Sequence, residues 1–224
     1  MTILNGNDPS SQGNLKLLPQ GNSLLSSMTA IRSSETGNAP FIDAFEKVAR
    51  QLIVSALDFV PTEPFKVVTP TGRAYNGHVQ RRLVCGVSIL RAGASFEGSL
   101  RDTYRGPLSF GTILIQRDET TCLPTHIYSK LPRSIASSTV LILEPMLATG
   151  GSASKAIEVL KENGVAEKDI VFVNLIASRA GLEAVMNRFP ELLFVTAAID
   201  EDMTPSRHIV PGLGDFGDRY YGTT

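Results

Sequence analysis

The sequence predicts an α/β fold built on a mainly parallel, twisted sheet that is flanked by helices. Two observations carry this prediction. First, five apolar runs are continuous instead of alternating, which is typical of strands buried on both faces. They are "LVCGVSIL" (83–90), "GTILIQ" (111–116), "TVLILE" (139–144), "IVFVNLIA" (170–177) and "LLFVTAAID" (192–200). Second, segments with helical spacing alternate with these runs through short links, which indicates parallel strands.

The first part of the chain is expected to hold a tail and two helices. Residues 1–20 are rich in Asn, Gly, Ser and Gln, so we expect a mostly disordered tail with Leu15 to Leu18 as its candidate docking segment. A short helix is expected over residues 24–32. Helical spacing predicts an amphipathic helix over residues 41–58, with an apolar face made of Phe41, Phe45, Val48, Ala49, Leu52 and Ala56. The folded domain is expected to span residues 21–224.

A hairpin and a third helix complete the expected elements. Residues 65–84, "FKVVTPTGRAYNGHVQRRLV", indicate two strands joined by a turn. Tyr75-Asn76-Gly77 is a turn signal, so we expect the turn there and a β-hairpin arm around it. Residues 152–162 place small and aliphatic side chains on one face and charges on the other, and Gly164 is a stop signal.

Composition indicates a soluble enzyme and excludes several other classes. The 224 residues suit one large domain or a domain with an arm. A formal net charge of −1 gives no overall field for nucleic acid. No stretch of 18 or more apolar residues occurs, and no secretion signal is evident, so we expect a cytoplasmic protein without a membrane partner. Cys85 and Cys122 lack metal-ligand spacing.

Charged residues follow three consecutive apolar runs. Arg91 follows the first run, Arg117 follows the second together with Asp118 and Glu119, and Glu144 ends the third. Ligands of parallel sheets bind outside the carboxyl ends of the strands. Three charged strand ends, two of them with arginine, therefore predict a site for a polyanion.

Residues 144–152, "EPMLATGGS", are called here the phosphate loop. Its last four residues lie between a strand and a helix, where free backbone amides and the helix dipole favour an anion. Glycines let the backbone approach a phosphate closely, and Ser152 is also a candidate helix cap. The loop lacks the lysine of a Walker loop and the spacing of a dinucleotide fingerprint. A simple tight turn is the alternative interpretation.

The phosphate loop resembles the phosphoribosyl pyrophosphate (PRPP) loop of type I phosphoribosyltransferases, and more narrowly that of uracil phosphoribosyltransferases. The resemblance continues through "CGVSILRAG", "ILIQRDETT", "IYSKLP" and "IVPGLGDFGDRYYGT". It covers about residues 24–224 and is closest to the eukaryotic branch. It implies the type I phosphoribosyltransferase fold, with residues 199–224 as a C-terminal uracil-binding hood.

The resemblance also implies roles for individual residues. Arg91 and Arg117 would bind the pyrophosphate, and the phosphate loop would hold the ribose hydroxyls and the 5′-phosphate. The loop residues are Glu144, Pro145, Met146, Leu147, Ala148, Thr149, Gly150, Gly151 and Ser152. Uracil would contact Ile209, Gly214, Asp215 and Phe216, with Asp215 also near PRPP. The catalytic candidates are Arg117, Glu144 and Asp215. Mg²⁺ would be carried by PRPP, without direct protein ligands.

The implied activity converts uracil and PRPP to UMP and pyrophosphate, a pentosyltransferase reaction of pyrimidine salvage. The resemblance implies a homodimer or homotetramer, which the hairpin arm suits. Two alternatives stay open. One is a catalytically weak or inactive nucleotide-binding regulator on the same fold, since fold does not fix function. The other is an enzyme that uses a different pyrimidine.

The chain departs from the family at three places. Glu144 stands where the family has Asp, which alters the reach of the carboxylate. His208 stands where the family usually has Tyr, and we expect a surface or packing residue there. Eukaryotic relatives carry scattered basic residues associated with a GTP activator. By rough alignment several of these positions fall on Asn38 and Ser138, which argues against GTP regulation.

Overall fold

The computed structural model describes residues 13–117 and 124–223 around one central sheet. The strands lie in the order β1 (Leu15–Leu17), β10 (Leu193–Asp200), β9 (Ile170–Ser178), β7 (Thr139–Leu143), β4 (Val84–Leu90), β5 (Leu108–Arg117) and β6 (Pro124–Lys130). The short strand β8 (Met146–Leu147) also pairs with β9. Every pairing in this sheet is parallel except that of β6 with β5. The predicted parallel α/β fold is confirmed.

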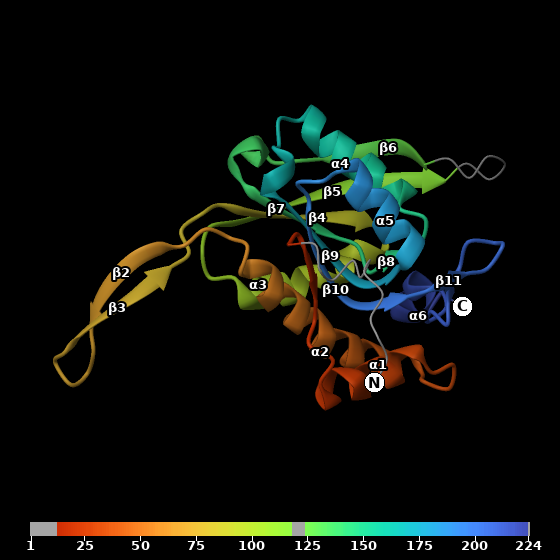
Figure 1. Cartoon of the computed structure of the whole chain (residues 1–224), viewed down its shortest axis with the longest axis horizontal. Helices are drawn as coiled ribbons and strands as arrows, with labels where there is room; N and C mark the ends of the chain where they lie inside the picture. Colours follow the sequence, from red (N-terminus) through yellow and green to blue (C-terminus); the bar gives the residue numbers. More distant parts are fainter. Residues whose placement is uncertain (1–12, 118–123, 224) are drawn as a thin grey trace.

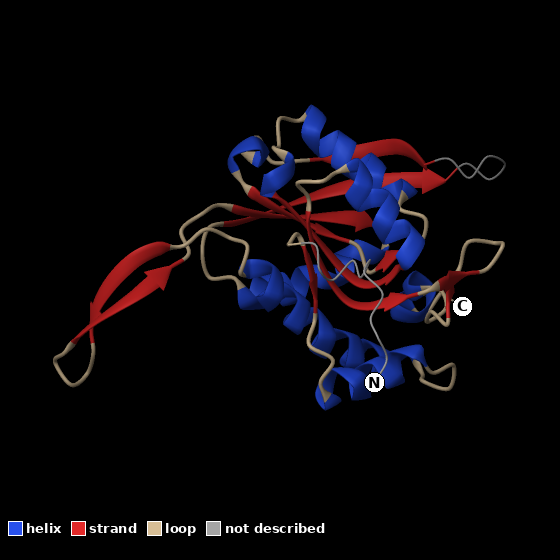
Figure 2. Ribbon diagram, viewed as in Figure 1, coloured by secondary structure: helices blue, strands red, loops and turns tan. Residues whose placement is uncertain are grey.

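Helices cover both faces of the sheet (Figures 1 and 2). One face carries α1 (Asn22–Arg32), α2 (Asn38–Leu57), the 3₁₀ helix η2 (Ala92–Phe96) and α3 (Glu97–Thr103). The other carries α4 (Gly151–Glu162) and α5 (Arg179–Arg188). Two short 3₁₀ helices, η3 (Ile135–Ser137) and η4 (Glu167–Asp169), precede β7 and β9. None of the helices in the described ranges is both long and apolar enough to cross a membrane.

The core is split into two clusters because side chains alternate along buried strands. Val171 and Val173 of β9 belong to the cluster that contains Phe45 of α2, whereas Phe172 of the same strand belongs to the cluster that contains Ile157 of α4. Continuous apolar runs were predicted to mark strands buried on both faces, and β9 is buried at all of its positions. Cys85 of β4 is buried, which raises the pKa of its thiol.

The two predicted N-terminal helices are confirmed with small shifts of their ends. The helix expected over 24–32 begins at Asn22, and the helix expected over 41–58 is α2, Asn38–Leu57. The apolar face predicted for α2 is buried in the core. Helix α4 ends close to the predicted position, and Gly164 follows it with a positive φ of 85°.

The expected tail is partly wrong. Leu15–Leu17 form β1, a parallel edge strand on β10, and Lys16 Nζ lies 2.6 Å from Asp58 Oδ2. Leu15 and Leu18 are buried, so the predicted docking segment is confirmed. The described residues 13–20 therefore belong to the domain. Pairing with β10 gives backbone N–H and C=O groups of β1 hydrogen-bond partners, and Leu15 and Leu18 are removed from water. Residues 1–12 lie outside the described residues.

The hairpin arm is confirmed, but its predicted turn is wrong. Strands β2 (Glu63–Val68) and β3 (Ala74–Val79) pair antiparallel and extend away from the sheet (Figure 1). The turn lies at residues 69–73, where Gly72 has a φ of 76° and the Thr69 amide bonds the Arg73 carbonyl at 2.8 Å. The Pro-Thr-Gly sequence there supplies the turn geometry. Asn76 and Gly77 therefore lie inside β3.

The C-terminal hood, residues 199–224, closes the chain. Its described part contains the antiparallel pair β11 (Asp202–Met203) and β12 (Ile209–Val210), followed by α6 (Phe216–Tyr221). Residues 211–214, called here the hood turn, lie between β12 and α6. They contain Gly212 and Gly214, with φ values of 63° and 83°. Phe216 inserts into the core, where its ring centroid lies 4.8 Å from that of Phe45. The hood is thereby fastened to α2 at the carboxyl edge of the sheet.

Candidate active site

The candidate site lies at the edge where the parallel strands β4, β5, β7 and β9 end (Figure 1). Arg91 directly follows β4, Arg117 is the last residue of β5, and Glu144 follows β7. The sheet topology therefore brings these three residues, distant in sequence, to one edge. This is the edge at which ligands of α/β sheets bind.

Gly150 determines the shape of the phosphate loop. It directly precedes α4 with a φ of 77°, a left-handed conformation that glycine adopts at low cost. A Cβ atom at this position would lie 2.6 Å from Val185 Cγ2 and 3.1 Å from the carbonyl oxygen of Gly181. The position thus excludes any side chain. The first turn of α4, whose amides have no partner within the helix itself, begins at this loop, a geometry that suits an anion.

The suggestion that Ser152 caps α4 is wrong. Gly150 is the N-cap residue, and a glycine has no side chain with which to cap the helix. Because α4 already begins at Gly151, Ser152 lies within the first turn instead of in front of it. The N-cap residue therefore takes up none of the first-turn amides through a side chain, which suits ligand binding there.

Ser178, which sequence analysis missed, holds the phosphate loop from the side of α5. Its hydroxyl donates to the carbonyl oxygen of Ala148 at 2.6 Å and accepts the Gly181 amide at 2.9 Å. A Cβ atom on Gly181 would lie 1.9 Å from the Ala148 oxygen, so loop and helix are in direct contact. The signal available in the sequence is a serine between an apolar run and a helix, a common N-cap pattern.

Glu144 is half-buried at the start of the loop. Its Oε1 accepts the amide of Met146 at 3.3 Å, and its carbonyl oxygen accepts Asn174 Nδ2 at 3.1 Å. Asn174 is fully buried in β9, where its Oδ1 accepts the hydroxyl of Thr196 at 2.9 Å. Sequence analysis missed Asn174 as well. Its signal is a single amide side chain inside the run "IVFVNLIA", where a buried polar group requires partners.

A cavity of about 470 Å³ is lined by both the phosphate loop and the hood. Glu144, Met146 and Ala148 line it from the loop. From the hood it is lined by Ser206, Arg207, His208, Ile209, Gly214, Asp215, Phe216 and Gly217. All four predicted uracil contacts therefore lie in one cavity with the predicted catalytic carboxylates Glu144 and Asp215. That these residues bind uracil and PRPP stays a prediction.

Two predicted site residues contribute less side-chain surface than expected. Leu147 is 2% exposed and packs under α4, so only its backbone remains near the loop surface. Phe216 lines the cavity, but it is 1% exposed and packs on three rings of the core. The predicted contact of Phe216 with uracil is therefore restricted to the small part of the residue that meets the cavity.

A second cavity of about 510 Å³ opens beside the first turn of α4. Thr149, Gly150 and Gly151 line it together with the cationic side chains of Lys155 and Arg188. Both cations contact Glu158. The phosphate loop thus runs from the hood cavity at Glu144 to a more positive surface at the helix N-terminus.

Arg91 contacts the end of the hood. Its Nη2 lies 3.3 Å from both Asp218 Oδ1 and Thr223 Oγ1, and its guanidinium lies 5.0 Å from the ring centre of Tyr221. The Tyr221 hydroxyl donates to the Arg91 carbonyl at 3.1 Å. Burial raises the pKa of Tyr221, while the positive charge of Arg91 opposes that shift. Arg91 therefore connects the end of β4 to the hood.

Arg117 ends β5 opposite Pro124 of β6. Its backbone position at the carboxyl edge agrees with the prediction. Its contact with pyrophosphate stays a prediction, and the acidic residues Asp118 and Glu119 that follow it lie outside the described residues.

A protein-family model described as uracil phosphoribosyltransferase matches residues 18–223. The chain belongs to the uracil phosphoribosyltransferase family. The resemblance indicated by the sequence motifs is confirmed, and it covers nearly the whole described structure.

Two named relatives agree with the family, and a solved structure shares the fold. The chain is 46% identical over 208 residues to a uracil phosphoribosyltransferase of Lachancea kluyveri, covering 93% of this chain and 96% of that one. It is 44% identical over 210 residues to one of Dictyostelium discoideum, covering 94% and 97%. The solved structure of the AQ2163 protein from Aquifex aeolicus matches with a TM-score of 0.80 at 29% identity, covering 94% of this chain and 99% of that one.

His208, one departure from the family pattern, lies on the surface as expected but also lines the hood cavity. Its Nδ1 lies 3.1 Å from Ser206 Oγ, which in turn lies 2.9 Å from Thr204 Oγ1. These polar contacts link the imidazole of His208, which lines the cavity, to Thr204. Sequence analysis did not anticipate that position.

The two residues at the family's expected GTP-associated positions are engaged within the fold. Asn38 Nδ2 donates to the carbonyl oxygens of Arg219 and Tyr220, at 2.6 and 3.0 Å. Ser138 is buried, and its hydroxyl donates to the Ser134 carbonyl at 3.0 Å. Both side chains therefore serve internal contacts, while the absence of GTP regulation stays a prediction.

The donor set of the hood cavity fits a magnesium ion that arrives with phosphates. Over residues 13–117 and 124–223 there is no group of three or more His, Cys, Asp and Glu side chains placed to hold a metal. Glu144 and Asp215 supply hard oxygen donors to one cavity. Mg²⁺ commonly binds through one or two carboxylates together with substrate phosphates and water.

Proposed function

We propose that this protein transfers the 5-phosphoribosyl group of PRPP to uracil and releases UMP and pyrophosphate. The observation that carries the proposal is the shared cavity, in which the phosphate loop and the hood of this family face each other. One wall suits a ribose phosphate and the other suits a planar base. The reaction belongs to pyrimidine salvage.

The base would be held largely by the backbone of the hood. Uracil presents two carbonyl groups and an N–H on one edge, which rigid amides and carbonyls near Gly214 can pair. Ile209 is apolar and mostly buried beside them. A backbone that is fixed in this way discriminates by hydrogen-bond pattern, because a wrong base leaves buried polar groups unpaired.

The sugar phosphate would be held by the phosphate loop. The first-turn amides of α4 and the hydroxyl of Thr149 suit the 5′-phosphate, and Glu144 suits the ribose hydroxyls. The Glu144 carboxylate already accepts one backbone amide, so its position is defined before a ligand arrives. Arg91 and Arg117 would bind the pyrophosphate as it leaves.

In the proposed step, a uracil ring nitrogen bonds the anomeric carbon while the bond from that carbon to the pyrophosphate oxygen breaks. The proton of that nitrogen passes to solvent water, and the bonding electrons of the broken bond leave with the pyrophosphate. Breaking runs ahead of bonding, so positive charge develops on the ribose, and Glu144 and Asp215 offset it. Magnesium, when bound with PRPP, would neutralise part of the charge of the leaving group. The protein supplies position and electrostatics, so no covalent nucleophile is required.

We infer that the protein acts in the cytoplasm. We also infer a homodimer or homotetramer, because the arm exposes apolar side chains on both of its strands. Phe65, Val68 and Tyr75 are 44%, 75% and 61% exposed. Exposed apolar surface of this kind favours a partner. Light scattering on the purified protein measures the assembly directly.

A pyrophosphate-release assay tests the activity. Purified protein, PRPP and Mg²⁺ are combined with uracil, cytosine, orotate or no base. Release that depends on uracil and yields UMP supports the proposal. Release with another pyrimidine supports the alternative substrate. Ligand binding by calorimetry without turnover supports the regulatory alternative.

A further inference from the structure

The backbone of Gly212 is bonded on both sides by one ion pair. Its N–H donates to Asp200 Oδ2 at 2.8 Å, and its carbonyl oxygen accepts Arg32 Nη1 at 2.9 Å. The same guanidinium bonds both carboxylate oxygens of Asp200, with Nη1 to Oδ2 at 2.8 Å and Nη2 to Oδ1 at 2.7 Å. The three residues come from the end of α1, the end of β10 and the hood turn. They form a closed triangle of hydrogen bonds.

This triangle is mostly removed from solvent. The side chain of Asp200 is 5% exposed and that of Arg32 is 26% exposed. A buried ion pair is costly unless its remaining hydrogen-bonding capacity is satisfied. Here the peptide groups of the hood turn supply the missing partners, so the pair and the turn depend on each other.

Gly212 has no side chain that could hold its conformation, and adding one would force the turn to shift. Its φ is 63°, and a Cβ atom would lie 2.2 Å from the carbonyl oxygen of Ile209. The turn conformation must therefore be selected by groups outside the turn. Arg32 and Asp200 are such groups.

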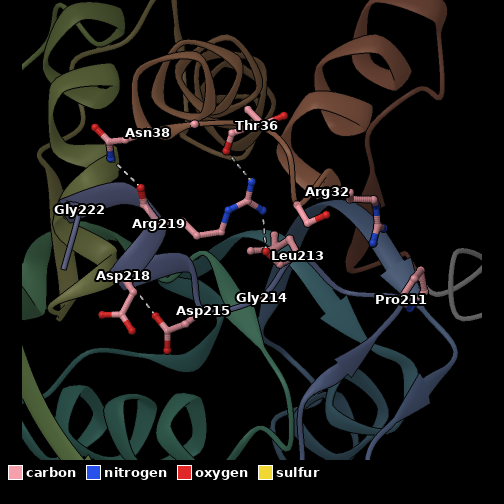
Figure 3. Close-up of a pocket in the computed structure, with 12 residues that line it drawn as sticks. Arg32, Thr36, Asn38, Pro211, Leu213, Gly214, Asp215, Asp218, Arg219 and Gly222 are labelled. Carbon is pink, nitrogen blue, oxygen red and sulfur yellow. Dashed lines mark hydrogen bonds between the residues drawn. The ribbon is translucent and has the colours of Figure 1, made fainter. Parts of the chain in front are cut away.

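The hood turn borders two cavities. Gly214 and the adjacent Asp215 line the hood cavity with Glu144, and they also line a third cavity of about 500 Å³ together with Arg32, Leu213 and Arg219. Figure 3 shows this third cavity, with Arg32 and Pro211 on one side and Arg219 bonded to Leu213. The described lining of the hood cavity includes neither Arg32 nor Asp200. The pair therefore supports the hood turn from outside the hood cavity.

We propose that Arg32 and Asp200 are positioning residues for the base, which fix the peptide of Gly212 and thereby align the backbone at Gly214 and Asp215 with uracil. This inference rests on the proposed transfer to uracil. A turn already ordered before binding loses little entropy when the base arrives. The pair should therefore act on the affinity for uracil and leave PRPP binding largely unchanged, because the phosphate loop is held by separate contacts.

Asp200→Asn is the first test, because it keeps the shape of the side chain and removes the charge. A neighbouring ion pair provides a matched control: Glu201 bonds Arg179 through two hydrogen bonds, and neither residue bonds the hood turn in the described contacts. The steady-state KM for uracil and for PRPP is measured for wild type, Asp200→Asn and Glu201→Gln. We expect the uracil KM to rise about tenfold in Asp200→Asn, equivalent to 1.4 kcal/mol. Its PRPP KM should stay within about twofold, and Glu201→Gln should match wild type.

Arg32→Lys is the second test, and it serves if Asp200→Asn fails to fold. It retains the positive charge of the side chain. An ammonium group can reach the carboxylate, but it lacks the planar fork that bonds Asp200 and Gly212 together. A purely structural role would lower the melting temperature and the active fraction, and hence the apparent kcat, without changing the KM of folded enzyme. A raised uracil KM with an unchanged PRPP KM supports the inference.

Two results overturn it in distinguishable ways. If wild type releases pyrophosphate with uracil, but folded Asp200→Asn and Arg32→Lys keep the wild-type uracil KM, the positioning role is wrong and the proposed function stands. If wild type shows no uracil-dependent release, the proposed function is wrong and the inference is rejected with it.

Discussion

The phosphate loop and the hood line the same cavity, yet different kinds of contact hold them. The loop is fastened within neighbouring strand–helix units, by Gly150 and by Ser178 only 30 residues from its partner Ala148. The hood turn is fastened by Asp200 nearby and by Arg32, which is 180 residues from Gly212. The phosphate loop is therefore held by contacts within a local supersecondary unit, whereas the hood turn depends on the assembled domain.

Arg219 strengthens this contrast. From α6 it donates to the carbonyl oxygens of Leu213, at 2.7 Å, and of Ser33, at 2.7 Å, and its guanidinium lies 4.3 Å from the ring centre of Phe41. Partial burial lowers the pKa of Arg219. One side chain thus ties the hood to the loop between α1 and α2. Variants that separate PRPP binding from uracil binding should therefore divide between the two regions.

The largest effect is expected at Glu144, where the loop meets the cavity. Glu144→Ala removes the carboxylate that offsets charge on the ribose, and we expect kcat to fall about a hundredfold or more. Glu144→Asp restores the residue type of the family and should keep or raise the rate. Steady-state rates at saturating uracil, PRPP and Mg²⁺ compare the three proteins. An Ala variant as active as wild type would show that this carboxylate has no part in the transfer.

The next largest effect is expected at Gly150, where a substitution should lower the affinity for PRPP and leave that for uracil unchanged. Gly150→Val forces a branched side chain into a left-handed position and against Val185, so the PRPP affinity should drop at least about tenfold. Gly72→Val in the arm shares the positive φ, 76°, but meets open space, so it controls for backbone strain. Calorimetric titration with PRPP checks both. Equal affinities in Gly150→Val and wild type would contradict the phosphate-loop assignment.

A reciprocal effect is expected at Gly212. Gly212→Ala places a methyl group against the Ile209 carbonyl, and the hood turn must shift to accommodate it. We expect the uracil KM to rise about tenfold and the PRPP KM to change less than about twofold. Kinetics with each substrate varied in turn provide the measurement. A rise in the PRPP KM of similar size would mean that the two regions do not act separately.

The smallest effect is expected from Arg219→Lys, which should act mainly on stability. Lysine cannot span the carbonyl oxygens that the guanidinium bonds, and buried carbonyls left without a donor cost about 1–3 kcal/mol. For a domain of this size the melting temperature should fall by about 2–10 °C. Differential scanning calorimetry measures the change. An unchanged melting temperature would show that Arg219 does not fasten the hood.

Local patterns were sufficient for the elements and for the phosphate loop. Apolar runs without alternation identified β4, β7, β9 and β10, since only strands covered on both faces tolerate them. The glycines between a strand and a helix correctly predicted a helix start, which lies at Gly151 of α4, while the binding of an anion there stays a prediction. The turn of the arm was assigned wrongly, since Asn-Gly and Pro-Thr-Gly are both turn signals and strand pairing decides between them.

The sequence by itself determined the fold class, the phosphate loop and the family, because each depends on residues that are close together in the chain. Only the tertiary structure decided what holds the hood turn. Arg32, Asp200 and Arg219 carry no local signal for that task, since an arginine at a helix end or an aspartate at a strand end is ordinary in sequence. Their partners are peptide groups of distant segments, and backbone groups look the same at every position of a sequence. Such contacts exist only after the sheet and helices have packed, and they fix the hood turn beside the cavity.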